Sequence, residues 1–396
     1  MTWERLRDGG RAAAAFDVPA YHRILSPDVP AFLEAYAALP AMRRLDGVGL
    51  LCGTDWTPLY RNRFYYSRLQ HSIGVALIVW HFTGDKVQTL AGLLHDIAAP
   101  VFSHVADFMC GDALTQRASE RGTERLIQDD GTLRRLLATD GIPVEAVCDY
   151  HRYPVADNEI PRLSADRLEY MFPSGAALHG QWTLPEIAEA YGGLLILQNE
   201  DGAPEIGFRS VEAAAAYCER FCMTGHVLQL NENKLALQLL AEIMKRASRL
   251  RLISEADCFS MSEADVLESW EAFCRNWRAR SEVDFKTPKE RREAGEFVRL
   301  FRTFRTMTEI VRSDKALDGH FCVNLRVKQR YIDPLVLADG GTFRAGADGS
   351  GWSRGAPVGT GRRLSERCAA SARLIQDFLS YQDAPFGCVR LVEPEG

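Results

Sequence analysis

The stretch GLLHDIAAPVFSH, residues 92–104, sets His95 beside Asp96 within an otherwise apolar run. An ionisable pair in such surroundings costs free energy unless its charge has a partner, and a divalent cation is an effective partner. Neighbouring residues of a helix project about 100° apart, which suits two adjacent ligands of one ion better than two members of one salt bridge. The stretch therefore predicts a helical protein built around a metal site.

Two further positions repeat this arrangement, because His71 and Asp166 also lie among apolar residues of expected helices. A single histidine on an apolar helix is more often a core residue than a ligand, so the prediction depends on the whole set. Two imidazoles and two carboxylates suit one divalent ion such as Mn, Fe, Co, Ni or Zn, with Mg as a further candidate. The predicted metal ligands are His71, His95, Asp96 and Asp166.

Most of the chain has the apolar periodicity of helices, so the expected fold class is mainly α. Asp85, followed by Gln88, is expected to cap the helix that leads to His95, and Pro100 is expected to end it. Ser164 is the expected cap of the helix that carries Asp166. Further helices are expected over residues 30–43, 68–82, 122–139, 143–151, 163–172, 210–251, 262–280, 289–312 and 364–380.

Strand-like sequence is confined to a few places. Residues 194–209 predict a hairpin around an Asp-Gly turn, and the chain alternates like strands from residue 320. The Gly-rich residues 339–361 predict a loop. We therefore expect a helical core over residues 1–250, with the metal site within 68–170, and a helical and smaller α+β C-terminal region over residues 251–396.

The composition limits the classes of protein to consider. The 396 residues are 46% apolar and 25% charged, which is typical of a globular protein. A net charge of −6 and a pI near 5.9 argue against a dedicated nucleic-acid-binding protein, but they do not exclude a local basic pocket for a small phosphorylated molecule. No apolar run suits a signal peptide or a membrane helix. The ten cysteines form no CxxC pair, and we expect Cys218 and Cys222 to be small buried side chains rather than a metal clip. Because no secretion signal is apparent, we expect reduced cysteines and a cytoplasmic protein.

Three blocks of the sequence resemble the HD-domain metal-dependent phosphohydrolase superfamily, closest to its deoxynucleoside triphosphate triphosphohydrolase branch. That family reads roughly RFEHSLGV, then AGLLHDIGHGPFSH, then DR-x-DY. The counterparts here are RLQHSIGV (68–75), AGLLHDIAAPVFSH (91–104) and DRLEY (166–170). Their order, spacing and wording agree. The resemblance implies an HD-domain helical bundle, one bound metal ion and a homodimer.

The resemblance also implies roles for single residues. Arg68 and Arg167 stand at phosphate contacts, and Tyr170 stands where an aromatic ring packs on the sugar. His104 matches a histidine near the phosphates, so it is a candidate to protonate the leaving oxygen, with Asp107 orienting it or acting itself. The structural alternatives are a solvated charge for each arginine and core packing for Tyr170. The candidate catalytic residues are thus His104, Asp107 and Asp96.

Two departures from the family pattern concern the substrate. Ala99 replaces a histidine that takes part at the reacting phosphate, and Ser174 replaces an aspartate that holds the sugar 3′-hydroxyl. The first questions triphosphate chemistry, and the second should weaken recognition of an ordinary deoxyribose. We therefore expect removal of phosphate from a nucleotide or modified nucleotide monophosphate by attack of metal-bound hydroxide, with a triphosphohydrolase as the alternative.

Three other classes stay open. A dinuclear oxygenase of the HD fold would need more histidine ligands, and His104 and His151 are the only histidines between the His-Asp pair and Asp166. A catalytically weak sensor would bind a nucleotide without turnover. A nuclease would need a basic surface, for which the sequence offers the short clusters 289–292 and 326–330. We expect both clusters to be solvated, although the second could instead be a phosphate or effector site.

Overall fold

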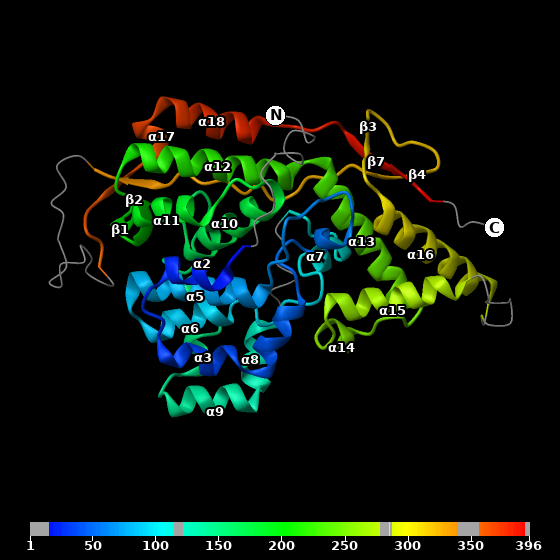
Figure 1. The fold of residues 1–396 in the computed structure, drawn as a ribbon, viewed down its shortest axis with the longest axis horizontal. Helices are drawn as coiled ribbons and strands as arrows, with labels where there is room; N and C mark the ends of the chain where they lie inside the picture. The colour runs from blue at the N-terminus through cyan, green and yellow to red at the C-terminus, as the bar shows by residue number, and fades with distance from the viewer. Residues whose placement is uncertain (1–15, 115–121, 278–284, 286, 339–355, 393–396) are drawn as a thin grey trace.

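A computed structural model describes residues 16–114, 122–277, 285, 287–338 and 356–392. It confirms the mainly α fold class, because helices form most of the described chain and two small sheets accompany them (Figure 1). The helices are α2 (Val18–Leu25), α3 (Ala31–Ala37), α4 (Pro40–Arg43), α5 (Arg68–Thr83), α6 (Lys86–Leu94), α7 (Val105–Met109), α8 (Thr123–Asp129), α9 (Gly131–Thr139), α10 (Ala165–His179), α11 (Leu184–Gly192), α12 (Val211–Gln229), α13 (Asn231–Arg249), α14 (Glu255–Cys258), α15 (Glu263–Arg275), α16 (Pro288–Thr306), α17 (Leu364–Arg367) and α18 (Ala369–Ser380). None of the described helices is long and apolar enough to cross a membrane.

Helix α5 lies at the centre of the part that holds the predicted ligands. It begins with a capping box, in which Ser67 Oγ accepts from the Gln70 N–H at 3.2 Å and the Gln70 side chain accepts from the Ser67 N–H at 2.8 Å. It ends at Gly84, whose φ of 63° is left-handed. Because other elements cover α5 on several sides, it is apolar and buried nearly all round rather than along one stripe.

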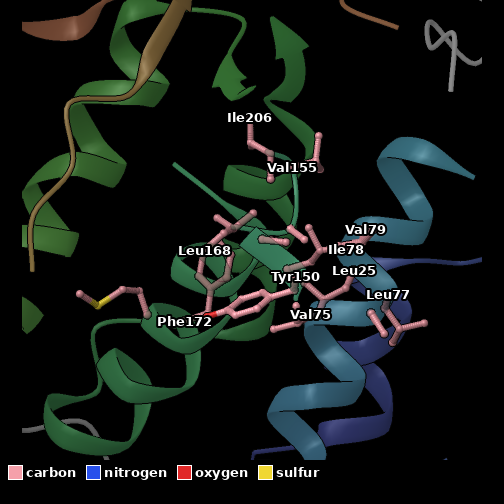
Figure 2. Packing of buried hydrophobic residues seen from close by; sticks show 14 of the residues in the cluster. Leu25, Val75, Leu77, Ile78, Val79, Tyr150, Val155, Leu168, Phe172 and Ile206 are labelled. Carbon is pink, nitrogen blue, oxygen red and sulfur yellow. The ribbon is translucent and has the colours of Figure 1, made fainter. Parts of the chain in front are cut away.

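Two helices pack directly on α5. Helix α6 approaches it closely at Gly92, where a Cβ would lie 3.3 Å from the Val75 side chain. Helix α10 contributes Leu168 and Phe172, which pack opposite Val75 and Ile78 of α5 in the larger hydrophobic cluster (Figure 2). This packing brings together the three segments that carry the predicted metal ligands.

The strands form two sheets. The strands are β1 (Leu194–Gln198), β2 (Pro204–Phe208), β3 (Val311–Ser313), β4 (His320–Val323), β5 (Leu335–Leu337), β6 (Gly361–Arg363) and β7 (Phe386–Arg390). One sheet has the order β1-β2-β5-β6 and the other the order β3-β7-β4. The expected hairpin is confirmed as β1 and β2. Residues 324–334, which have no helix or strand, run from β4 in one sheet to β5 in the other.

The three-stranded sheet contradicts one expectation about the cysteines. Cys322 of β4 is the register partner of Cys388 of β7, and the two form a disulfide across 66 positions of sequence. The expectation of reduced cysteines is therefore wrong for this pair, since only the strand pairing brings the two side chains together. Cys218 and Cys222, in contrast, are buried in the larger hydrophobic cluster, as expected.

Two expected helices differ from the structure between α7 and α10. Residues 122–139 form two helices rather than one, because the Asp130 side chain caps α9. Residues 143–151 form short 3₁₀ turns rather than an α-helix. There the Asp149 side chain accepts from the His151 N–H at 3.1 Å, a local bond that competes with a helical ladder.

The helix before the His-Asp pair ends earlier than expected. Asp85 caps α6 as predicted, accepting from the N–H groups of Val87 and Gln88. The helix stops at Leu94, well before Pro100, so His95 and Asp96 lie in the turn that follows. The expectation that this pair sits on a helix is therefore wrong, and the turn sets the direction of each side chain.

Two large hydrophobic clusters fill the described part of the molecule. The larger contains residues of α5, α6, α10 and α12, and the second contains residues of α7, α13, α15 and α16. Both clusters include residues from before and after position 250, and the division of the chain there stays a prediction. Of the expected loop 339–361, residues 339–355 lie outside the described residues, and Gly361–Arg363 form β6.

Candidate metal centre

The four predicted ligands line one cavity and lie close together. His71 Nε2 is 3.1 Å from Asp166 Oδ1 and 3.9 Å from Asp96 Oδ2. His95 Nε2 is 3.5 Å from Asp96 Oδ2 and 3.8 Å from Asp166 Oδ1. Ligand atoms of His71, His95 and Asp96 all lie within 4.8 Å of one another. One ion with ligand distances of about 2.1 Å can span atoms at such separations.

The orientation of the two imidazoles also fits a metal ion. The Nδ1 atom of His95 lies 2.7 Å from the Gly92 carbonyl oxygen, which can only accept, so this nitrogen carries the proton. The Nδ1 atom of His71 lies 2.5 Å from Glu169 Oε2. Both histidines therefore direct Nε2 towards the two aspartates, which is the arrangement of metal-ligating histidines whose other nitrogen is held by a second residue.

Glu169 is a residue of this site that the sequence reasoning did not single out. It is fully buried, and besides His71 it accepts a hydrogen bond from the Tyr66 hydroxyl at 2.6 Å. Gly74 of α5 makes room for it, because a Cβ at that position would lie 2.4 Å from Glu169 Oε1. The available signal was its spacing, one helical turn after Asp166 on the same helix. Glu169 holds the His71 ring in place.

The charges of the site are strongly coupled. Arg68 Nη1 lies 2.5 Å from Asp96 Oδ2. Burial raises the pKa of Asp96, but Arg68 and the two histidines outweigh it and hold this pKa well below its usual range. Burial lowers the pKa of His71, but Glu169 and Asp166 outweigh it and raise this pKa to about 10. Surroundings that hold a proton this firmly also attract a cation, and a metal ion would displace that proton.

Of the two predicted catalytic residues His104 and Asp107, His104 lines the same cavity and Asp107 is not among the lining residues. His104 Nδ1 lies 2.8 Å from Asp107 Oδ2, and Asp107 is fully buried. Burial, reinforced by the positive charges of Arg68 and Arg330, lowers the pKa of His104 although Asp107 opposes this. The turn before His104 contains two non-glycine residues with left-handed φ angles, Phe102 (60°) and Ser103 (45°). Such strained positions cluster at functional sites.

The Arg167 guanidinium contacts protein oxygens around the loop before α10. Its Nε donates to the Arg162 carbonyl oxygen at 2.8 Å, and its Nη2 donates to the backbone and side-chain oxygens of Asn158. Its Nη1 lies 3.3 Å from Asp157 Oδ1. Although Arg167 lines the cavity, these bonds favour a role in bracing the loop before α10, and its role as a phosphate contact stays a prediction.

The cavity has a polar side and an apolar side. Arg68, Tyr170, Lys328 and Arg330 line it together with the metal ligands and His104. The Arg330 guanidinium lies 5.5 Å from the centre of the Tyr170 ring. Arg330 and Lys328 come from the segment 324–334, within the basic cluster noted in the sequence. The apolar lining comes from Leu50, Leu51, Leu178, Leu228, Leu237 and Val327.

The two departures from the family pattern differ in position. Ala99 is buried in the larger hydrophobic cluster, its carbonyl accepts from Arg44 at 2.8 Å, and it is not among the cavity-lining residues. Ser174 lines the cavity. His151 also lines it, 3.4 Å from Asp157. Among the described residues, His71, His95 and Asp96 are the one group of His, Cys, Asp or Glu side chains close enough together to hold an ion. The described part of the chain therefore offers no second metal site in support of the oxygenase alternative.

Two known proteins are similar to the chain in sequence. No protein-family model matches the chain. The chain is 25% identical over 286 residues to the uncharacterized protein YdhJ of Bacillus subtilis, which covers 71% of this chain and 77% of that protein. It is 30% identical over 104 residues to the metal-dependent phosphohydrolase cns2 of Cordyceps militaris, covering 26% and 30% of the two chains.

Two solved structures share the fold over nearly the whole chain. A hypothetical protein from Aquifex aeolicus superposes with a TM-score of 0.56 at 15% identity, over 92% of this chain and 93% of that one. A phosphohydrolase from Bacteroides thetaiotaomicron superposes with a TM-score of 0.57 at 11% identity, over 92% and 97%. The protein thus has the fold of a solved phosphohydrolase, and it carries a His-His-Asp cluster that can hold a metal ion.

Proposed function

We propose that the protein is an HD-type metal-dependent phosphohydrolase that removes phosphate from a nucleotide or modified nucleotide monophosphate. One observation carries the proposal: the two histidines, the two aspartates, His104 and Arg68 all line one cavity, and the buried Asp107 contacts His104. The similarity to a metal-dependent phosphohydrolase over 104 residues supports the reaction class. The substrate class is the finer part of the proposal and rests on the lining of the cavity.

The residues divide the work of hydrolysis. A divalent ion between His71, His95, Asp96 and Asp166 would supply a Lewis acid that activates water. The water oxygen forms a bond to phosphorus, the bond from phosphorus to the ester oxygen breaks, and the leaving oxygen takes up a proton. Arg68 lies one helical turn before His71, where it holds Asp96 and adds positive charge beside the reacting phosphate.

His104 is the proposed proton donor to the leaving oxygen. Its Nδ1 faces Asp107, so Nε2 is the nitrogen that would reach the substrate. Burial, together with the charges of Arg68 and Arg330, lowers the pKa of His104 in the protein without substrate. A dianionic phosphate bound between these cations would offset their charge, so the proton would become available when the substrate is in place.

The lining of the cavity supports a substrate in which the phosphate is joined to an uncharged group with a planar ring, as in a nucleotide. Tyr170 offers an aromatic ring, and the leucines that line the cavity offer apolar contacts. Ala99, which lies in the hydrophobic core, adds no group for further phosphates. Both features support a monophosphate over a triphosphate. The metal identity, the homodimer and the cytoplasmic location stay predictions.

Phosphate release tests the proposal. Metal-stripped protein is supplied with Mn, Fe, Co, Ni, Zn or Mg and given a panel of nucleoside mono-, di- and triphosphates, with Asp96→Ala as the control. We expect orthophosphate from monophosphates and its loss in the variant. Tripolyphosphate from triphosphates would instead support the triphosphohydrolase. Binding without release of either product under any metal would overturn the hydrolase and support a sensor.

A further inference from the structure

We propose that Arg330, together with Lys328, binds the phosphate group of the substrate, so that the segment 324–334 from the C-terminal part of the chain completes the active site. The inference deepens the proposed function and rests on it. It gives a role to the basic cluster that the sequence left as a solvated face or an effector site.

The charges that line the cavity are the first argument. The basic side chains are Arg68, Arg167, Lys328 and Arg330, and the carboxylates are Asp96, Asp157 and Asp166. Without the two residues from the segment 324–334, the carboxylates would outnumber the basic groups. With them, and with a divalent ion bound, the cavity is clearly electropositive. That balance suits a dianionic phosphate, whose charge needs more than the ion alone.

The different uses of the arginines are the second argument. Arg68 contacts the metal ligand Asp96, and Arg167 braces the loop before α10. Arg330 lies instead over the face of the Tyr170 ring. An aromatic face positions a guanidinium without cancelling its charge, and the planar fork of arginine matches two phosphate oxygens. Arg330 lines the same cavity as Asp166 and His104, where the phosphate would react.

The backbone around Arg330 is held firmly, which is the third argument. A Cβ at Gly225 of α12 would lie 2.6 Å from the Arg330 carbonyl oxygen, so this glycine allows a close approach. The Gln329 side chain donates to Leu379 O at 3.1 Å. The Lys328 N–H donates to Ala113 O at 3.2 Å. A side chain on such a fixed backbone is suited to bind a ligand in one position.

Direct binding of inorganic phosphate tests the assignment. The dissociation constant is measured by calorimetry on Mn²⁺-loaded wild type and on Arg330→Met, Arg330→Gln and Arg326→Met. Arg326 belongs to the same cluster but does not line the cavity, so it controls for the loss of one charge. We expect Arg330→Met and Arg330→Gln to weaken phosphate binding at least about tenfold and Arg326→Met to change it less than about twofold. The Mn²⁺ affinity should stay unchanged in all variants.

The glutamine variant keeps the test decisive if the methionine variant does not fold, since it retains a polar side chain that can donate hydrogen bonds. A second probe is Gly225→Ala, which should displace the Arg330 backbone and weaken phosphate binding without a change in Mn²⁺ affinity. Phosphate affinity within twofold of wild type in a folded Arg330 variant, or no phosphate binding to wild type, overturns the inference.

The outcome can be separated from that of the proposed function. Arg330-dependent phosphate binding by a protein that hydrolyses no phosphate ester would leave this inference standing and remove the hydrolase. Normal hydrolysis with full phosphate affinity in the Arg330 variants would do the reverse.

Discussion

Two parts of the cavity lining, the metal ligands (the metal end) and the basic residues Lys328 and Arg330, are built in different ways. At the metal end, ligands from α5, α10 and the turn after α6 are held by partners: Glu169 for His71, the Gly92 carbonyl for His95 and Arg68 for Asp96. The cationic side of the cavity, made of Lys328 and Arg330, comes from an irregular segment that runs between two sheets. The metal end is thus a local product of three packed segments, whereas the cationic side depends on distant parts of the chain.

Because of this difference, we expect metal binding and phosphate binding to depend on different parts of the chain. The metal end can keep its geometry as long as α5, α6 and α10 stay packed. The affinity for phosphate depends on whether the C-terminal region is correctly placed. Variants at the first end should therefore change metal binding, and variants at the second should change phosphate binding alone.

The largest effect is expected from loss of a ligand at the metal end. Asp96→Ala removes a carboxylate and leaves Arg68 without its partner, so we expect turnover to fall by roughly a thousandfold or more, with loss of bound metal. The measurements are kcat/KM for the best substrate and metal content. Asp129→Ala, at an exposed carboxylate, is the matched control. Full metal content in Asp96→Ala would remove Asp96 from the ligand set.

Arg167 tests whether bracing or phosphate binding explains that residue. Arg167→Ala leaves the buried Asp157 without this cation, and we expect a loss of about 3 kcal/mol in the free energy of unfolding. Chemical denaturation measures this loss. An unchanged stability together with a raised KM would instead support the phosphate contact that the resemblance implied.

Glu169 tests the internal support of the metal end. Glu169→Gln keeps the size of the side chain but weakens its hold on His71, so we expect metal affinity to fall about 10- to 100-fold. Titration with Mn²⁺ measures the change, and Glu212→Gln, at an exposed residue of α12, is the control. Phosphate binding at saturating metal should be unaffected, and an equal loss of both affinities would contradict the separation of the two ends.

The smallest effect concerns the loop that carries His104. Glu263 of α15 is buried and accepts from the Phe102 N–H at 3.1 Å, and burial raises its pKa to about 7. A raised folded-state pKa gives stability that is present below the usual value of 4.5 and is lost as pH rises through 7. We expect a loss of roughly 1.5 kcal/mol between about pH 4.5 and about pH 6, absent in Glu263→Gln. Equal pH slopes in both proteins would contradict this.

The sequence was most informative where function depends on neighbours along the chain. The cap residues Asp85 and Ser164 act as predicted. His71 and His95 are buried, as their apolar neighbours in the sequence indicated. The early end of α6 was missed, since the apolar pattern continues through Ile97 and shows no break before Pro100.

Contacts between distant segments were beyond the sequence pattern. In the sequence, Glu169 looks like an ordinary glutamate of a helix. Its contact with His71 exists only because α5 packs on α10. In the sequence, Arg330 is one of several charges in a basic run. No local feature of the sequence shows that residues of the segment 324–334 line the cavity. In both cases the role follows from tertiary packing.

The disulfide between Cys322 and Cys388 gives the cationic side a dependence on its redox surroundings. It closes a covalent ring that contains the whole segment 324–334. A ring of this size lowers the conformational entropy of the unfolded chain and so raises the free energy of that state by about 4 kcal/mol. Where thiols are kept reduced, the β4–β7 ladder alone would hold that end of the segment. Oxidation would then stabilise the phosphate side of the cavity and leave the metal ligands, which lie outside the ring, as they are.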